Sequence, residues 1–422
     1  MQSLELFLHE RYVGIVVPNL RDRTRVSLEV DGTYQPEVLL SESFTVLPGF
    51  RPPKEAVSNF LGGYVPEGNQ RERMAARRHI DTNDLFALLN EFGGSIAGAV
   101  NLRRADESPR YCPAYEPLDN QALADKLRQA LKDSDQGIPD DSRSTLPGYQ
   151  PKVLVAKFDE QWVYPHGRAH STHILKPQVP SRPSRIFDEH YSHLLTKHLG
   201  MSSYSSDIRD ADGVLYLAIG RFDRQVENGV VRLIHQEDMA QAMGLDWLDT
   251  DVKFEDSSRP NDPARATMRR IATSLGQIPG GSTAVEQWVR QVTYNLAIGN
   301  NDAHAKNVAL MHLATETQLS QIYDAVPNLF QDGLINWNLA LSVDGQFDHR
   351  RISIEHLLAE VNAWGVIPER RAIAAITETL IALDDAIAEV TPPIGVSEGL
   401  VDQLQWNIRQ LRTGQEIGQR KR

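Results

Sequence analysis

Alternating apolar and polar positions predict that the chain begins with three short strands. The alternation covers 4–8 and 11–17, breaks at His9–Glu10 between them, and returns at 24–30. Three helices are expected next, at about 53–61, 70–79 and 85–92. Glycine pairs directly follow the first and the last of these helices. Because this stretch contains no catalytic motif, we interpret it as a packing or partner-binding unit.

The middle of the chain mixes both patterns around two polar segments. Residues 103–120 are rich in proline and charge, which predicts a linker. Residues 132–152 form a long polar loop with glycine, proline and hydroxyl side chains. The elements expected around these segments are a helix at 120–132, strands at 153–158, 171–176 and 214–222, and a helix at 185–199.

Beyond about residue 231 the pattern becomes mostly helical. One hairpin is expected inside this region, formed by 307–313 and 318–323. The predicted helices lie at 264–275, 283–298, 354–363, 368–389 and 396–411. A β-rich first part is therefore followed by a helical second part.

The overall composition limits the setting and the partners. With 422 residues, 41 % hydrophobic and 24 % charged, the chain is typical of a soluble globular protein with two or three packed units. No apolar run approaches the roughly 20 residues that span a bilayer. A single cysteine, Cys112, excludes an intrachain disulfide, so a cytoplasmic setting is expected. The net charge of −12 opposes a large direct DNA-binding surface.

A polar loop directly after the predicted helix 283–298 holds the strongest chemical signal. Asp302 and Asn307 have the D-x-x-x-x-N spacing of phosphoryl-transfer loops, where the Asp takes the proton of the acceptor hydroxyl and the Asn ligates a metal ion. The hairpin that follows would return Asp324 to the side of Asn307. One carboxylate and one amide suffice for the Mg²⁺ of ATP. The spacing alone also occurs in ordinary turns.

Other segments follow in the order that kinases use. Lys176 ends a strand and Glu189 lies near the start of the next helix, as in sites where the lysine grips phosphates, although a surface salt bridge is the alternative. Residues Pro147–Lys152 could wrap phosphates with backbone N–H groups, and an ordinary surface loop would look the same. Residues Gly220–Phe222 would contact the adenine. The order of parts predicts a two-lobed kinase plan.

Taken together, these segments resemble the HipA family of Ser/Thr kinase toxins from bacterial toxin–antitoxin pairs. The resemblance extends to FLGGYVPEG in the first unit and so covers essentially the whole chain. The segments that carry it are STLPGYQPK, HILKP, GRFDR, HQEDMAQAMG, IGNNDAHAKN and IYDAVP. It implies an α+β, two-lobed, protein-kinase-like fold with a β-rich N-terminal part and an all-helical C-terminal lobe. The expected units are 1–103, 104–230 and 231–422.

The resemblance also implies roles for individual residues. Asp302 would be the catalytic base, Asn307 and Asp324 would hold Mg²⁺, and Thr145, or alternatively Ser144, would be autophosphorylated. The family has a serine at the position of Thr145, and its best-studied type has a glutamate at the position of Gly220. The residues that would bind ATP are Pro147, Gly148, Tyr149, Gln150, Pro151, Lys152, Lys176, Gly220, Arg221, Phe222, His304, Ala305, Lys306, Asn307, Tyr323 and Asp324.

The family's activity further implies partners. The substrate would be a protein, an aminoacyl-tRNA synthetase such as glutamyl-tRNA synthetase, and its phosphorylation would inhibit translation and lead to growth arrest or persistence. A HipB-like antitoxin would neutralise the kinase and provide the only contact with DNA, and no membrane is involved. Two alternatives stay open. One is a small-molecule kinase, although such an enzyme would not need the first unit. The other is a catalytically silent corepressor that acts with the antitoxin, although such a protein would not need intact motif residues.

Overall fold

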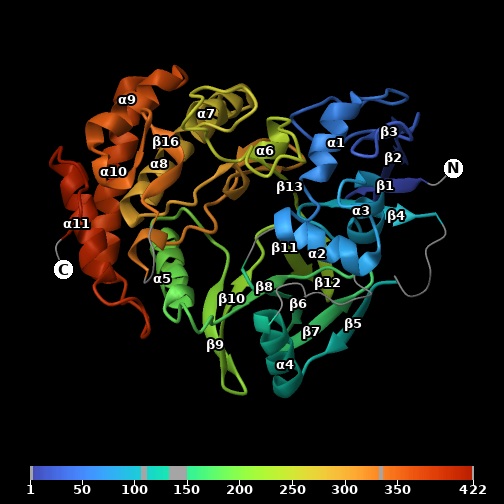
Figure 1. Cartoon of the computed structure of the whole chain (residues 1–422), viewed down its shortest axis with the longest axis horizontal. Coiled ribbons are helices and arrows are strands. Elements are labelled where there is room, and N and C mark those ends of the chain that lie inside the picture. The colour runs from blue at the N-terminus through green and yellow to red at the C-terminus, as the bar shows by residue number, and fades with distance from the viewer. Residues whose placement is uncertain (1–2, 106–111, 133–149, 332–335, 421–422) are drawn as a thin grey trace.

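The protein contains two large antiparallel sheets, three smaller ones and a group of helices (Figure 1). A computed structural model describes residues 3–105, 112–132, 150–331 and 336–420. The helices of the C-terminal part gather at one side, and the sheets lie at the other. The α+β, two-lobed fold class that the sequence predicts is confirmed. Among the described residues, no helix is long and apolar enough to cross a membrane.

The first unit is a four-stranded antiparallel sheet with the order β3-β2-β1-β4. Its strands are β1 (Leu4–Leu8), β2 (Arg11–Pro18), β3 (Val26–Val30) and β4 (Val100–Arg104). The three leucines of β1 are buried and alternate with half-buried residues, as expected for a sheet with one face on a core. The predicted helices are present as α1 (Lys54–Gly62), α2 (Gly68–Arg78) and α3 (Leu85–Phe92).

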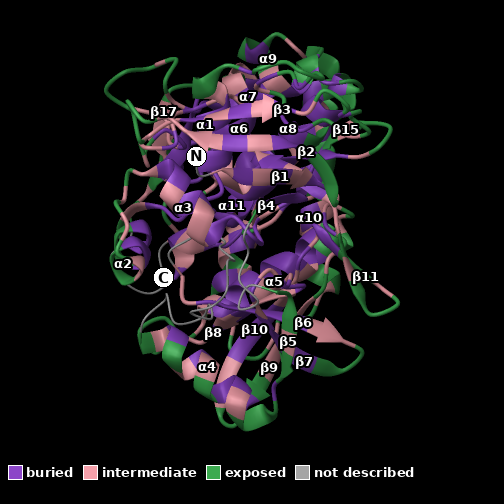
Figure 2. Cartoon of the chain, turned by 90° about the vertical axis from the view of Figure 1, so that its right-hand side faces the viewer, coloured by how far each residue is buried: buried purple, intermediate pink, exposed green. Residues whose placement is uncertain are grey.

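The second unit is a six-stranded antiparallel sheet, β5-β7-β6-β8-β10-β9, with α4 (Asn120–Lys132) and α5 (Arg185–His198). Its strands are β5 (Ala114–Pro117), β6 (Val153–Phe158), β7 (Gln161–His166), β8 (His173–Pro177), β9 (Ser206–Ala211) and β10 (Val214–Gly220). The linker prediction for 103–120 is therefore wrong at β5, which pairs with β7 at the sheet edge. An exposed hairpin, β11 (Arg224–Glu227) and β12 (Val230–Leu233), follows β10 (Figure 2).

The C-terminal lobe is built on the buried α8 (Gly281–Ile298), which packs against α10 (Glu369–Glu389). Its other helices are α6 (Met239–Ala242), α7 (Met268–Gln277), α9 (Ile354–Trp364) and α11 (Leu400–Arg412). The lobe is not entirely helical, because it also contains a small sheet of β13 (His235–Asp238), β14 (Ala309–His312) and β15 (Thr317–Leu319), and a hairpin of β16 (Asn338–Val343) and β17 (Gln346–Asp348). The predicted hairpin around 307–323 corresponds to β14 and β15.

The first unit packs directly against the start of the helical lobe. Trp247 lies in the core of the first unit, where its indole N–H donates to the carbonyl oxygen of Thr24 at 3.1 Å. A Cβ atom at Gly62 would lie 2.2 Å from the Trp247 ring, so only glycine allows this approach. The Gln241 carboxamide also donates to the carbonyl oxygen of Phe60 at 2.7 Å. These contacts fix the first unit against Gln241 and Trp247 at the start of the helical lobe.

Candidate active site

The predicted catalytic loop is held rigidly at the end of α8. Gly299 caps the helix with a φ of 71°, and a Cβ atom there would lie 2.4 Å from the Phe330 ring. The Asn300 carboxamide donates to Asn295 Oδ1 at 2.9 Å, and its oxygen accepts from the backbone N–H of Asp302 at 3.1 Å. The backbone at Asp302 is therefore fixed by a side-chain bridge to the helix.

Two further contacts close the loop around Asn307. The Asn307 carboxamide nitrogen donates to the carbonyl oxygen of Asp302 at 2.9 Å, which leaves the Asn307 oxygen as the atom available to a ligand. The Tyr323 hydroxyl donates to the carbonyl oxygen of Lys306 at 2.9 Å. Asp324 has a left-handed φ of 52°, a backbone conformation that residues other than Gly, Asn and Asp rarely adopt. Hairpin β14–β15 thus returns Asp324 to the loop.

Asn307 and Asp324 line one cavity of about 220 Å³ between the second unit and the helical lobe. Its apolar wall includes Tyr204, Phe222 and Tyr323, with ring centroids 6.1 Å apart for the first pair and 5.2 Å for the second. Lysines, carboxylates and an aromatic wall in one cavity suit a ligand that has both a flat ring and phosphates.

Lys176, Glu189 and Asp324 form an ion cluster in this cavity, which we call the open cluster. Lys176 Nζ lies 2.6 Å from Glu189 Oε1 and 2.9 Å from Asp324 Oδ1. Burial lowers the pKa of Lys176, but the charges of Asp324 and Glu189 outweigh it and raise the pKa. The Lys176 charge in turn lowers the pKa of Asp324 to about 2, whereas burial raises the pKa of Glu189.

Lys152 is a second buried lysine on the wall of this cavity. Burial and the neighbouring Lys176 lower the pKa of Lys152 to about 8. A bound anion would oppose both effects and favour the charged ammonium. The cavity therefore holds two lysines that gain from a phosphate group.

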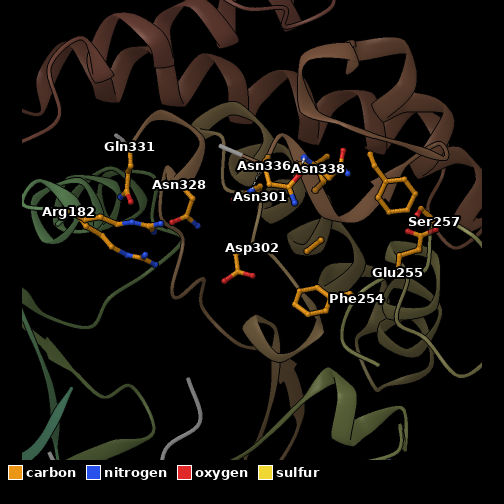
Figure 3. Close-up of a pocket in the computed structure, with 14 residues that line it drawn as sticks. Arg182, Phe254, Glu255, Ser257, Asn301, Asp302, Asn328, Gln331, Asn336 and Asn338 are labelled. Atoms are coloured by element: carbon orange, nitrogen blue, oxygen red, sulfur yellow. Dashed lines mark hydrogen bonds between the residues drawn. The ribbon is translucent and has the colours of Figure 1, made fainter. Parts of the chain in front are cut away.

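Asp302 faces a different space, an open hollow of about 540 Å³ on the other side of the loop (Figure 3). Its side chain is 53 % exposed to this hollow. Partial removal of the Asp302 carboxyl from water, together with the charge of Asp324, raises the pKa of Asp302 to about 6. A carboxylate with such a pKa is still ionised at neutral pH and accepts a proton more readily than an ordinary aspartate.

A residue of the first unit also reaches the catalytic loop. Glu67, the residue before α2, lies with one carboxylate oxygen 2.9 Å from Lys253 Nζ and pairs through the other with Lys306 Nζ. Burial would raise the pKa of Glu67, but the two lysines outweigh it and lower the pKa to about 2. The backbone of Lys253 also accepts from the N–H of Ala305 at 3.2 Å.

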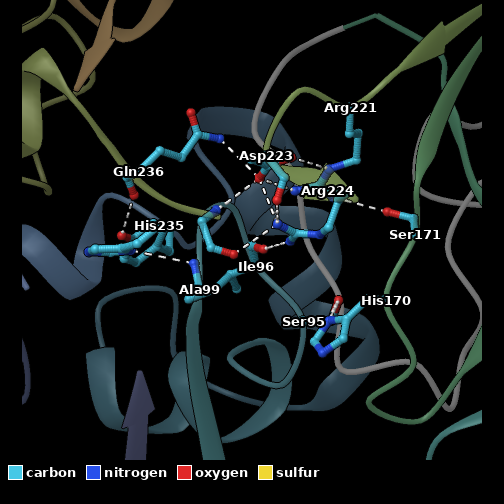
Figure 4. Close-up of polar contacts among 12 residues, drawn as sticks. Ser95, Ile96, Ala99, His170, Ser171, Arg221, Asp223, Arg224, His235 and Gln236 are labelled. Carbon is cyan, nitrogen blue, oxygen red and sulfur yellow. Dashed lines mark hydrogen bonds and ion pairs between the residues drawn. The ribbon is translucent and has the colours of Figure 1, made fainter. Parts of the chain in front are cut away.

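A second ion cluster, the hinge cluster, lies directly after β10 and consists of Arg221, Asp223 and Arg224 (Figure 4). Asp223 accepts from both guanidinium groups at 2.8–2.9 Å, from the backbone N–H of Gly98 at 2.9 Å and from Gln236 at 3.0 Å. The three charged side chains are 1–3 % exposed. The cluster therefore joins the segment at the end of β10, which we call the hinge (Gly220–Arg224), to Gly98 of the first unit and Gln236 of the helical lobe.

Comparison with known proteins identifies the family. The family model of the HipA N-terminal domain matches residues 4–103, and that of the HipA-like C-terminal domain matches residues 144–387. The chain belongs to the HipA kinase family. The expected unit limits at 103 and 230 stay predictions.

Individual HipA relatives are similar over much of the chain. A putative kinase, Y4mE of Sinorhizobium fredii, is 29 % identical over 276 residues, which is 63 % of each chain. The Ser/Thr-protein kinase toxin HipA of Shewanella oneidensis is 24 % identical over 357 residues, 81 % of this chain and 79 % of that one. A solved complex of Shewanella oneidensis HipA, HipB and operator DNA contains a chain with a TM-score of 0.79 and 21 % identity, covering 97 % and 96 % of the two chains.

The structure brings together most of the described residues that the HipA resemblance assigns to ATP. His304 and Ala305, which belong to the loop, are instead buried and do not line the cavity, and Gln150 and Pro151 precede β6 without lining it. Those that line the cavity are Lys152, Lys176, Gly220, Arg221, Phe222, Lys306, Asn307, Tyr323 and Asp324. Residues Ser144, Thr145, Pro147, Gly148 and Tyr149 lie outside the described residues.

Arg221 and His304 differ in their surroundings from a ligand-binding side chain. The Arg221 guanidinium is used by Asp223 and by Ser171 Oγ at 3.0 Å. His304 packs edge-on against Phe254, and burial lowers its pKa to about 3. The sequence reasoning also missed Glu67, although its segment, VPEG, belongs to the motif that carries the resemblance in the first unit.

Proposed function

We propose that this protein is a Ser/Thr protein kinase that transfers the γ-phosphate of ATP to a protein hydroxyl. One observation carries the proposal. Asp302 lines the open hollow, whereas Asn307 of the same loop and Asp324 line the cavity with Lys176. A nucleotide in the cavity and an acceptor in the hollow would thus meet at this loop, close to Asp302.

The cavity lining fits Mg²⁺ and the phosphates of ATP. Asn307 offers its carboxamide oxygen and Asp324 its second carboxylate oxygen, and both are hard ligands that Mg²⁺ prefers. No group of three His, Cys, Asp or Glu residues in the described part of the chain could hold a metal by itself, so phosphate oxygens would complete the coordination. A bound Mg²⁺ would neutralise part of the phosphate charge. Lys176 and Lys152 would pair with the remaining charge.

The backbone of the hinge would take the adenine. The N–H groups of Gly220 and Arg221 are already used, by the carbonyl oxygens of Ser205 and Thr172 at 2.8 Å each. Among the described residues, the N–H of Phe222 has no backbone acceptor, so it is the donor left for a ring nitrogen. The Phe222 and Tyr323 rings lie beside it.

Asp302 would supply the base for the transfer. It takes the proton of the serine or threonine hydroxyl as that oxygen forms its bond to the γ-phosphorus. The bond from the γ-phosphorus to the bridging oxygen breaks, and ADP leaves with the electron pair. The raised pKa of Asp302, about 6, favours this proton transfer near neutral pH.

The finer parts of the proposal rest on the family. They are an aminoacyl-tRNA synthetase substrate such as glutamyl-tRNA synthetase, inhibition of translation with growth arrest or persistence, and a HipB-like antitoxin that makes the DNA contact. Autophosphorylation at Thr145, or alternatively Ser144, and a cytoplasmic location belong here too. The similarity to a HipA chain solved with HipB and operator DNA supports the antitoxin partner.

The decisive experiment is incubation of the whole chain with γ-labelled ATP, Mg²⁺ and a panel of synthetases. Label is expected on one synthetase and on the chain itself, and Asp302→Asn is expected to reduce transfer about 10²–10⁴-fold with ATP binding retained. Label on an aminoglycoside or sugar alone would instead support a small-molecule kinase. Equal transfer rates for the wild type and Asp302→Asn would exclude Asp302 as the base. No transfer at all by the wild type would favour the silent corepressor.

A further inference from the structure

The open hollow beside Asp302 contains polar groups that none of the described contacts uses. Gln331 is 6 % exposed, yet neither polar atom of its carboxamide has a hydrogen-bond partner among the described residues. The same holds for the buried Nε of Arg185. Both residues line the hollow. Because buried polar groups in proteins are nearly always partnered, these atoms indicate a binding site for an external ligand.

The two sides of the hollow carry opposite charge. Arg182 and Arg185 lie on one side, and within the described ranges neither guanidinium forms a side-chain hydrogen bond or ion pair. Glu255 lies on the other side, with one oxygen accepting from the backbone N–H of Ser342 at 2.8 Å. Figure 3 shows Asp302 between Arg182 and Glu255. An acceptor hydroxyl at Asp302 would therefore have cations on one side and a carboxylate on the other.

The remaining lining suits a peptide. The carboxamides of Asn328 and Asn338 accompany that of Gln331. One N–H of Asn328 donates to Asn300 Oδ1 at 3.3 Å, and its second N–H and its oxygen stay for a peptide group. Phe254 and Phe347 add apolar surface for side chains. The volume of about 540 Å³ lies within the usual range of ligand sites, roughly 300–1,000 Å³.

We propose that this hollow binds the acceptor segment of the protein substrate in extended form, and that Arg182 and Arg185 select an anionic side chain on one side of the accepting hydroxyl. The anion is a carboxylate of Asp or Glu, or a phosphate already present on the segment. Glu255 disfavours an anion on the opposite side. This inference rests on the proposed kinase function and adds the substrate class.

The test uses the full chain with Mg-ATP and serine peptides of neutral sequence, with one Asp placed in turn at each position from −4 to +4. We expect Asp on one side only to raise kcat/KM, about two- to fivefold, the range of a partly exposed ion pair. Phosphoserine at the best position would raise it further if the site is built for phosphate, and equally or less if it is built for carboxylate. Arg182→Glu should reverse the preference, so that Lys replaces Asp at the same position.

Two controls separate charge recognition from general damage. Arg21→Glu changes the same charge at an exposed position of the first unit and should keep the wild-type preference. Arg182→Gln should reduce the preference while the KM for ATP stays constant, because Arg182 lines the hollow and not the nucleotide cavity. Efficient transfer with no positional preference, or the same preference in Arg182→Glu, would overturn the inference alone. Absence of transfer to any protein or peptide would instead overturn the kinase function.

Discussion

The open cluster and the hinge cluster are made of the same chemistry but are arranged in opposite ways. In the open cluster one cation, Lys176, lies between two carboxylates, and Asp324 is 41 % exposed to the cavity. In the hinge cluster one carboxylate, Asp223, lies between two arginines and is 3 % exposed. Asp223 accepts five hydrogen bonds, which use its capacity fully. One oxygen of Glu189 has no partner among the described residues.

The difference indicates what each cluster is for. In the hinge cluster the carboxylate is fully hydrogen-bonded, although Arg224 Nε has no partner among the described residues. Such a buried carboxylate fixes one geometry, because its loss leaves two buried cations without a counter-charge. An incompletely satisfied cluster beside a cavity can exchange partners when a ligand arrives. In the proposed function Lys176 would leave Asp324 for a phosphate, and Asp324 would then be free for a metal ion. The hinge cluster joins the units, and the open cluster is the one that we propose binds the ligand.

The largest effect is expected for Asp223→Asn, which tests whether the hinge cluster stabilises the fold. Two guanidinium groups would stay buried without their counter-charge, and we expect a loss of about 3–5 kcal/mol in the free energy of unfolding. Urea unfolding followed by circular dichroism measures it. Asp207→Asn, which removes an exposed pair with Arg209, serves as the matched control and should cost less than about 1 kcal/mol. Similar losses in the two variants would remove the distinction.

Asp324→Asn tests the open cluster in the same chemical way. We expect phosphate transfer to fall about 10²–10³-fold, because the variant loses a charge that would stabilise the transferring group through the metal. The free energy of unfolding should change by less than about 1 kcal/mol, since the side chain is 41 % exposed. Single-turnover transfer and urea unfolding on the same sample give both values. A variant that unfolds readily would assign Asp324 a structural role.

Lys176→Met separates ligand binding from folding within the open cluster. The variant keeps the length of the side chain and removes the ammonium that would pair with phosphate. A charge-assisted hydrogen bond contributes about 1.5–3 kcal/mol, so we expect the Kd for Mg-ATP to rise roughly 10- to 100-fold. Calorimetric titration with ATP measures it, and an unchanged Kd would contradict the proposed partner exchange.

The smallest effect expected is a pH-dependent loss of activity without unfolding. Asp302 is protonated below its pKa of about 6, so kcat/KM should be halved there and fall further as the pH decreases. Arg221 and Arg224 lower the pKa of Asp223 below that of an ordinary aspartate, despite its burial. The ionised Asp223 therefore stabilises the fold at every pH above the pKa of the unfolded chain, and this stabilisation is lost only as the pH falls through the lower pKa of the folded protein. Between pH 4.5 and 6 the protein should therefore be folded but poorly active. Parallel loss of circular dichroism and activity would refute this.

Local patterns in the sequence predicted most of the fold and the centre of the site. The D-x-x-x-x-N spacing lies within one loop, and the contact between Lys176 and Glu189 links a strand to the next helix, so both could be read from neighbouring segments. Strand β9 was missed because its sequence, SDIRDA, is polar and lies at a sheet edge, where alternation is weak. Glu67 was missed because its partners, Lys253 and Lys306, lie far away in the sequence. Arg182 was missed because its proposed partner is a substrate, and a pattern of neighbouring residues contains no information on either kind of contact.

The carboxylate of Glu67 makes the first unit a structural part of the loop that holds Asp302. Lys253 and Lys306 both take a counter-charge from it, so deletion of the unit would remove a carboxylate shared by two largely buried cations. We therefore expect the helical lobe to be less stable when it is produced without the first unit. A replacement for this unit would need an acid in the place of Glu67.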